Sequence, residues 1–187
     1  MLDPEKDWID AFAALKPADA SIVGIMNLAD VVERLTNKVE PNMPGATVTP
    51  GIFKFNKAVF IAQLMVLIPT PLPDWIPKVA GAWSAGCMGG IITPGCVAAP
   101  LVWLVSSSDV NTLPVAVVTI PTIAVGQALI VSMMAGVPGL MAVDAKSAQD
   151  MFARSFFAAV SAFTFSLIGI AGTPITPVTL PVVVPAK

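Results

Sequence analysis

The side chains of this chain that could carry chemistry are few, because histidine is absent and only two cysteines occur. These cysteines, Cys87 and Cys96, are separated by eight residues. A structural zinc site needs four Cys or His ligands, so the pair does not indicate a bound metal. We expect both thiols to be free and buried; a disulfide between them is the alternative in an oxidising compartment.

A run of hydroxyl side chains, Ser106-Ser107-Ser108, precedes Asp109. A nucleophilic serine needs a neighbouring base, and histidine, the usual one, is missing. The run is therefore expected to form a polar turn or a helix cap, with Asp109 as part of it. The glycine-containing pairs 89–90 and 94–95 match neither the P-loop pattern nor the dinucleotide-binding pattern. The sequence thus predicts no catalytic, cofactor-binding or metal-binding residue, no small-molecule substrate and no enzyme activity.

Small residues recur between positions 81 and 90, at spacings that place several of them together on a helix. Such residues let a neighbouring helix approach closely, so we interpret them as a packing surface. They are Gly81, Ala82, Ala85, Gly86, Gly89 and Gly90.

Composition limits the class of protein further. The chain has 187 residues, of which 56% are hydrophobic and 12% are charged, with a formal net charge of −2. Ordinary globular domains carry about 25% charged residues. Disorder is excluded by the high hydrophobicity, and a nucleic-acid partner by the lack of a basic surface. The remaining classes are a membrane protein and a protein whose apolar surface is buried in a larger assembly.

The charges divide the chain into a polar and an apolar part, since residues 1–57 hold 14 of the 22 charged side chains. We predict a polar N-terminal helical pair over residues 1–40 and a Pro/Gly-rich linker over 41–50. An apolar helical body then covers residues 51–187 and ends in an extended tail over 172–187. Because that tail carries prolines at short intervals, we expect it to form polyproline II or an edge strand.

The first predicted helix covers residues 4–16. Asp3 suits its N-cap and Pro4 its first helical position. Apolar residues follow at i, i+3, i+4 and i+7, which predicts a buried stripe: Trp8, Ala11, Phe12 and Leu15.

The second predicted helix covers residues 20–38. Its inward face is expected to contain Ile22, Met26, Ala29 and either Val32 or Val31, with charged residues on the opposite face.

The fold class that we predict is mostly α, with short apolar helices bounded by prolines and joined by extended Thr/Val/Pro-rich segments. In the body, Thr49-Pro50 is interpreted as the start of a helix over 51–68. Ser147-Ala-Gln-Asp150 has the form of a capping box, which supports a helix start there. The expected helices of the body cover 51–68, 76–91, 122–136 and 147–170, and the expected extended segments lie near 110–121 and 172–186.

Three uncharged spans, 79–108, 110–143 and 155–186, are each long enough to cross a bilayer as a helix. The charges between them satisfy the positive-inside rule with a cytoplasmic N-terminus. Prolines nevertheless interrupt every span, and each one removes a backbone hydrogen bond that hydrocarbon cannot replace.

Parts of the chain resemble small hydrophobic structural proteins of bacteriophage tails and baseplate hubs. The resemblance rests on Trp8-Ile-Asp-Ala-Phe-Ala-Ala-Leu15, on the segment 146–160 (KSAQDMFARSFFAAV) and on Gly172-Thr-Pro174, a small part of the chain. It implies assembly contacts, or membrane contact at a tail tip, with no catalytic residues to carry over.

The sequence therefore leaves two candidate functions. The first is a non-enzymatic structural component of a large assembly of the phage virion or tail type. It would bind other subunits as a homo- or hetero-oligomer, contact lipid where the assembly does, and lie in the virion. The alternative is a three-span integral protein of the bacterial inner membrane, similar to a holin or a small pore. The interrupted spans favour the assembly.

Overall fold

The computed structural model describes residues 4–15, 22–40, 47–48, 50–51, 53–66, 72–92, 96–98, 109–110, 123–141, 143–162, 164–171 and 178–185. Most of these residues are helical, as predicted. The helices are α1 (Pro4–Ala13), α2 (Ile22–Thr36), α3 (Lys57–Met65), α4 (Leu72–Met88), α5 (Ile123–Met134), α6 (Val137–Met141) and α7 (Ala145–Ser161). The strands are β1 (Thr47–Val48), β2 (Phe53–Lys54), β3 (Ile91–Ile92), β4 (Cys96–Ala98), β5 (Asp109–Val110), β6 (Thr164–Ala171) and β7 (Val178–Pro185).

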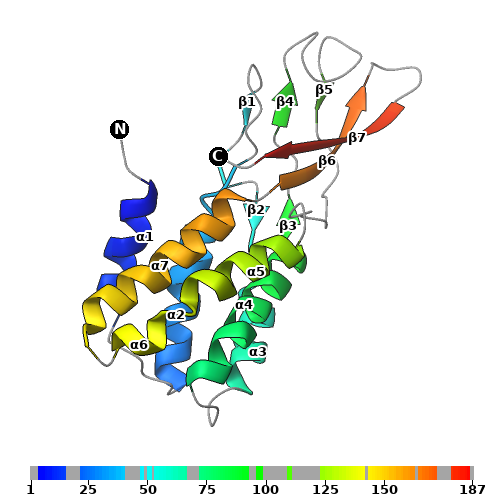
Figure 1. Cartoon of the computed structure of the whole chain (residues 1–187). Coiled ribbons are helices and arrows are strands. Elements are labelled where there is room, and N and C mark those ends of the chain that lie inside the picture. Colours follow the sequence, from blue (N-terminus) through cyan, green and yellow to red (C-terminus); the bar gives the residue numbers. More distant parts are fainter. Residues whose placement is uncertain are drawn as a thin grey trace.

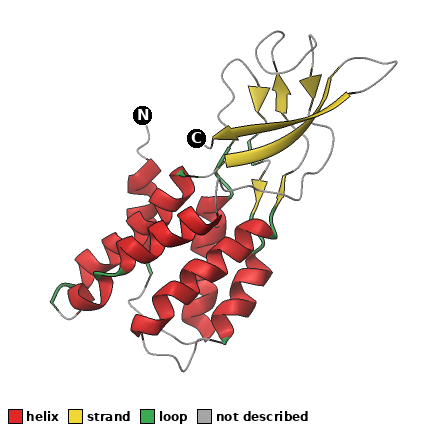
Figure 2. Ribbon diagram, turned by 45° about the vertical axis from the view of Figure 1, so that its right-hand side comes forward, coloured by secondary structure: helices red, strands yellow, loops and turns green. Residues whose placement is uncertain are grey.

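The helices gather into one bundle, and a sheet lies beyond one end of it (Figure 1). In that sheet five antiparallel strands follow the order β1-β4-β5-β6-β7, and a separate pair, β2 with β3, lies between the sheet and the helices. A second view shows the same separation of helices and sheet (Figure 2). Among the described residues, no helix combines the length and hydropathy needed to cross a membrane.

The stripe predicted for the first helix is confirmed. Trp8 and Phe12 are buried, and Ala11 and Leu15 pack partly buried against the core. Pro4 is the first residue of α1, as expected, whereas Asp3 lies outside the described residues.

The inward face predicted for α2 is confirmed for Ala29 and Val32 and wrong for Ile22 and Met26. Ile25, Leu28, Ala29 and Val32 are buried, while the other expected members, Ile22 and Met26, are exposed. Both rows have helical spacing and both are apolar, so periodicity alone could not separate them. The contacts of α2 with α1 and α3 select the row that is buried.

The helix predicted over 51–68 begins later, at Lys57. Gly51 adopts a φ of 72°, β2 follows, and the side chain of Asn56 accepts the Val59 amide as the N-cap of α3. Pro50 therefore does not start a helix, and Thr49 lies outside the described residues. The positive φ at Gly51 breaks any helix there, and glycine is the residue that adopts it without strain.

The next predicted helix begins earlier than expected, since α4 starts at Leu72 and contains Pro77. The donor that Pro77 lacks would have bonded to the carbonyl of Pro73, near the start of the helix, where losing one bond interrupts it least. Helix α5 lies close to its predicted range.

The prediction of a helix over 147–170 is wrong at both ends. Asp144, not Ser147, is the N-cap, and its side chain accepts the amides of Lys146 and Ser147. The helix ends at Ser161, and β6 follows, paired over its whole length with β7. The apolar residues after 161 fit a helix or a strand equally well, and the strand forms because β7 supplies its hydrogen-bond partners. The expected extended C-terminal tail is confirmed over 178–185, as the last strand of the sheet.

Candidate functional site: the polar clamp between α2 and α3

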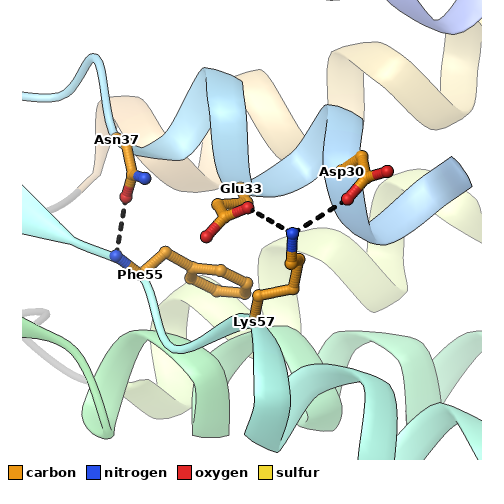
Figure 3. A network of polar contacts seen from close by, with 5 residues as sticks. All are labelled: Asp30, Glu33, Asn37, Phe55 and Lys57. Carbon is orange, nitrogen blue, oxygen red and sulfur yellow. Dashed lines mark hydrogen bonds and ion pairs between the residues drawn. The ribbon is translucent and has the colours of Figure 1, made fainter. Parts of the chain in front are cut away.

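A cluster of polar contacts joins α2 to the beginning of α3 (Figure 3). The Lys57 ammonium lies 2.9 Å from Oδ1 of Asp30 and 2.8 Å from Oε2 of Glu33. Asp30 and Glu33 are three residues apart on α2, a spacing that places both side chains on one face of a helix. One cation on α3 thus bridges two carboxylates on α2, and we call this cluster, with Asn37 and the Phe55 backbone, the polar clamp.

The chain that leads into α3 is fixed by two asparagines. The amide of Phe55 donates to Oδ1 of Asn37 at 2.6 Å, at the end of α2 (Figure 3). The amide of Asn56 donates to the carbonyl of Gly86 at 3.0 Å, and its side-chain Nδ2 donates to the carbonyl of Gly89 at 3.2 Å. Asn56 therefore caps α3 and bonds the end of α4 at the same time.

Two glycines of the predicted small-residue surface make room for this segment. A Cβ at Gly86 would lie 2.4 Å from Cζ of Phe55, and a Cβ at Gly90 would lie 2.6 Å from Cε2 of Phe53. Both rings are buried. The close approach predicted at these residues is present, but the approaching element is the β2 segment and not a helix.

The chemistry of the polar clamp is that of a structural link. Hydrogen bonds from Lys57 to Glu33 and Asp30 raise the pKa of the ammonium above its ordinary value. Lys57 therefore stays protonated at neutral pH, and a protonated lysine is neither a nucleophile nor a base. Within the described part of the chain, no group of three or more His, Cys, Asp or Glu residues is arranged to hold a metal ion.

Cys87 is a free thiol buried in α4, as we expected, and not part of a disulfide. Burial raises the pKa of the thiol well above its usual value, so it is protonated and unreactive at neutral pH. Cys96 begins β4. The serine run at 106–108 lies outside the described residues, whereas Asp109 pairs with Ala98 in the sheet and is not in the turn or cap that we predicted.

Sequence reasoning missed the residues that organise these contacts. Asn56 carried a usable signal, since asparagine directly before an apolar run of helical spacing is typical of an N-cap. Asn37 and Gln149 carried none, because their partners are far away in the sequence. The side chain of Gln149, on α7, donates to the carbonyls of Phe12 and Leu15 at the end of α1.

No protein-family model matches this chain, and neither a curated protein sequence nor a solved structure shows significant similarity to it.

Proposed function

We propose that this chain is a non-enzymatic structural subunit of a large assembly of the phage virion or tail type, with its apolar surfaces buried against neighbouring subunits. The observation that carries the proposal is the position of the sheet. Its two long strands, β6 and β7, contain eight residues each and no charged residue. The strands of the sheet pack mainly on one another, and the described helices pack mainly among themselves.

An antiparallel sheet in a monomer usually has one face on the core and one polar face in water. The uncharged strands β6 and β7 lie beyond the helical bundle, and the described helices make few contacts with them. Burial against other subunits covers them, which is the arrangement of obligate assemblies.

Exposed apolar side chains at the start of α2 support the same proposal. Ile22 is 57% exposed, Val23 64% and Met26 41%, and all three lie within the first two turns. Three neighbouring exposed apolar side chains are typical of an interaction surface rather than of scattered surface residues.

The first test separates an assembly subunit from the alternative, a three-span membrane protein. The full chain is produced in bacterial cells, its membrane fraction is extracted with alkaline carbonate, and the released protein is sized by sedimentation velocity without detergent. We expect release by carbonate and a mass of many subunits. Quantitative retention in the membrane pellet contradicts the proposal and supports the membrane protein, while a released monomer contradicts both.

Matched variants then locate the contact. Replacing Ile22, Val23 and Met26 by serine is expected to lower the sedimenting mass, because it removes apolar area from the interface. The control replaces Val66 and Val143, which are 72% and 87% exposed but isolated from each other in the chain, by serine. A mass that falls equally in both variants contradicts a role of the α2 surface.

A further inference from the structure

Strand β7 occupies the end of the five-stranded sheet, so one of its backbone edges has no partner among the described strands. A free edge presents unpaired amide and carbonyl groups and is a template for a further strand. The sequence of β7, VTLPVVVP, has no charge and four valines. Uncharged β-branched segments are the ones that pair with copies of themselves, and proline is the residue that interrupts them.

The register shows where the prolines of β7 direct their backbone. Pro181 pairs with Ile168 and Pro185 pairs with Thr164 on β6. In an antiparallel ladder, residues alternate between pairs that exchange both hydrogen bonds and pairs that exchange none. Proline has no amide hydrogen, so both prolines must occupy pairs of the second kind.

The backbone groups of such pairs point away from the partner strand, here toward the free edge. Because Pro181 and Pro185 are four residues apart, Thr179 and Val183 belong to the same alternating set. Leu180 and Val182 belong to the other set and direct their amides to β6. The free edge thus has four outward positions, and only Thr179 and Val183 offer an amide donor there.

We propose that Pro181 and Pro185 close the free edge of β7 against addition of a further strand, specifically the β7 strand of a second copy of this chain. Two antiparallel copies of β7 would have to exchange hydrogen bonds through the outward set, in which every second donor is missing. Pairing of two copies through this edge is therefore disfavoured. This inference concerns the edge alone and does not depend on the proposed function.

Hydrogen exchange of the unaltered chain tests the geometry directly. We expect the amides of Thr179 and Val183 to exchange at least about tenfold faster than those of Leu180 and Val182, which are bonded within the ladder. Residue-resolved exchange, by NMR or by fragmentation mass spectrometry, measures this ratio in the chain as it exists. Equal protection of the two sets overturns the proposal, because the edge would then be paired already.

Substitution tests the blocking role. Replacing both prolines by threonine, P181T/P185T, restores the two missing donors without adding hydrophobicity. We expect the variant to gain concentration-dependent mass in sedimentation velocity and protection at Thr179 and Val183. The control makes the same change away from the edge, at Pro50 and Pro138, and is expected to keep the mass of the parent.

A compensating variant distinguishes edge pairing from other association. In the P181T/P185T background, moving the two prolines to positions 179 and 183 again leaves only two outward donors, so the parent mass is expected to return. If P181T/P185T keeps the parent mass and retains far-UV circular dichroism, the prolines do not block the edge. If the compensating variant associates like P181T/P185T, the association uses another surface and the proposal is wrong. If the proposed assembly does not form, the parent chain itself sediments as a monomer, whichever result the proline variants give.

Discussion

The ring of Phe55 lies directly against Gly86, which is possible because glycine has no Cβ. The missing Cβ at position 86 therefore sets the distance between the β2 segment and α4. A Cβ at position 86 would stand 2.4 Å from the Phe55 ring, well inside contact distance. The ring is buried and also meets Phe60 edge-on, with centroids 5.5 Å apart. It therefore has little freedom to move away from an added methyl group.

We predict that Gly86→Ala destabilises the fold by about 1–3 kcal/mol, the usual cost of overpacking a core. Helix propensity acts in the opposite direction, since alanine is favoured over glycine in a helix by about 1 kcal/mol. Urea unfolding followed by circular dichroism measures the net effect.

The matched control is Gly139→Ala in α6, where an added Cβ meets no atom within 4 Å. This variant should be neutral or slightly more stable, because only the propensity difference remains. Equal effects of the two variants would show that the contact with Phe55 does not decide the outcome.

Lys57 gives a prediction about pH. Its pKa is raised in the fold, so the stabilisation by its ion pairs is fully present below the unfolded lysine pKa of about 10.4. That stabilisation is lost as the pH rises from there through the higher pKa of the folded state. We expect Lys57→Met to lower stability by at most about 1 kcal/mol at pH 7, because Asp30 is mostly exposed.

Urea unfolding at pH 7, 9 and 11 checks this sign: the difference between Lys57→Met and the parent should shrink at pH 11. Lys54→Met, an exposed lysine in β2, serves as the control. A difference that grows with pH would contradict the assignment of the ion pairs.

At the scale of elements, α7 is fixed at its start by its own cap and by a contact with α1. Asp144 accepts hydrogen bonds from the Ser147 hydroxyl and from the first amides of α7. These bonds, with that of the Ser147 hydroxyl as the largest cause, lower the pKa of its carboxyl group. One turn further, Gln149 donates to two carbonyls at the end of α1. The last carbonyls of a helix have no partner inside it, so this side chain acts as a C-cap supplied from another helix.

We predict that Gln149→Glu destabilises the docking of α1, since the carboxylate has no N–H to donate and repels the carbonyl oxygens. The Phe12 carbonyl keeps its hydrogen bond from the Leu15 amide, whereas the Leu15 carbonyl loses the Gln149 donor. The expected loss is about 1–3 kcal/mol, the cost of removing the donor from a partly buried carbonyl. Urea unfolding measures it, and faster hydrogen exchange in α1 would localise it. Gln63→Glu, at an exposed position of α3, is the control and should have little effect.

At the scale of the molecule, one aromatic cluster connects the N-terminal helix to α4 and α7. The Phe156 ring is stacked on Trp8, with centroids 6.0 Å apart and an interplanar angle of 6°. It also meets Trp83 edge-on at 6.1 Å and Phe12 at 5.7 Å. Two of these contacts link residues more than 140 positions apart, so they form only when the helices pack.

We predict that Phe156→Ala costs about 3–5 kcal/mol, the usual range for removing a buried phenylalanine. Phe157→Ala, a half-buried neighbour, is the control and should cost clearly less. Unfolding followed by tryptophan fluorescence and by far-UV circular dichroism should shift together in Phe156→Ala. Transitions that separate would show that α1 and the remaining helices do not unfold as one unit.

Local sequence patterns were sufficient to predict much of the helical part of the structure. The stripe of Trp8 and Phe12 repeats at the helical period, and the free, buried state of Cys87 follows from its Ala/Gly-rich surroundings. The extended character of 178–185 follows from its prolines and valines. These features depend only on residues that are close together in the sequence, so the sequence alone was enough to predict them.

Local patterns were thus enough to predict a mostly helical protein without histidine chemistry and with an extended C-terminal tail. Three features depended on packing between distant segments. These are the apolar row of α2 that is buried, the strand at residues 164–171, and the contacts between helices that Asn37, Asn56 and Gln149 make. Several local conformations of these segments have nearly equal free energy, and packing and hydrogen bonds with distant segments select one of them.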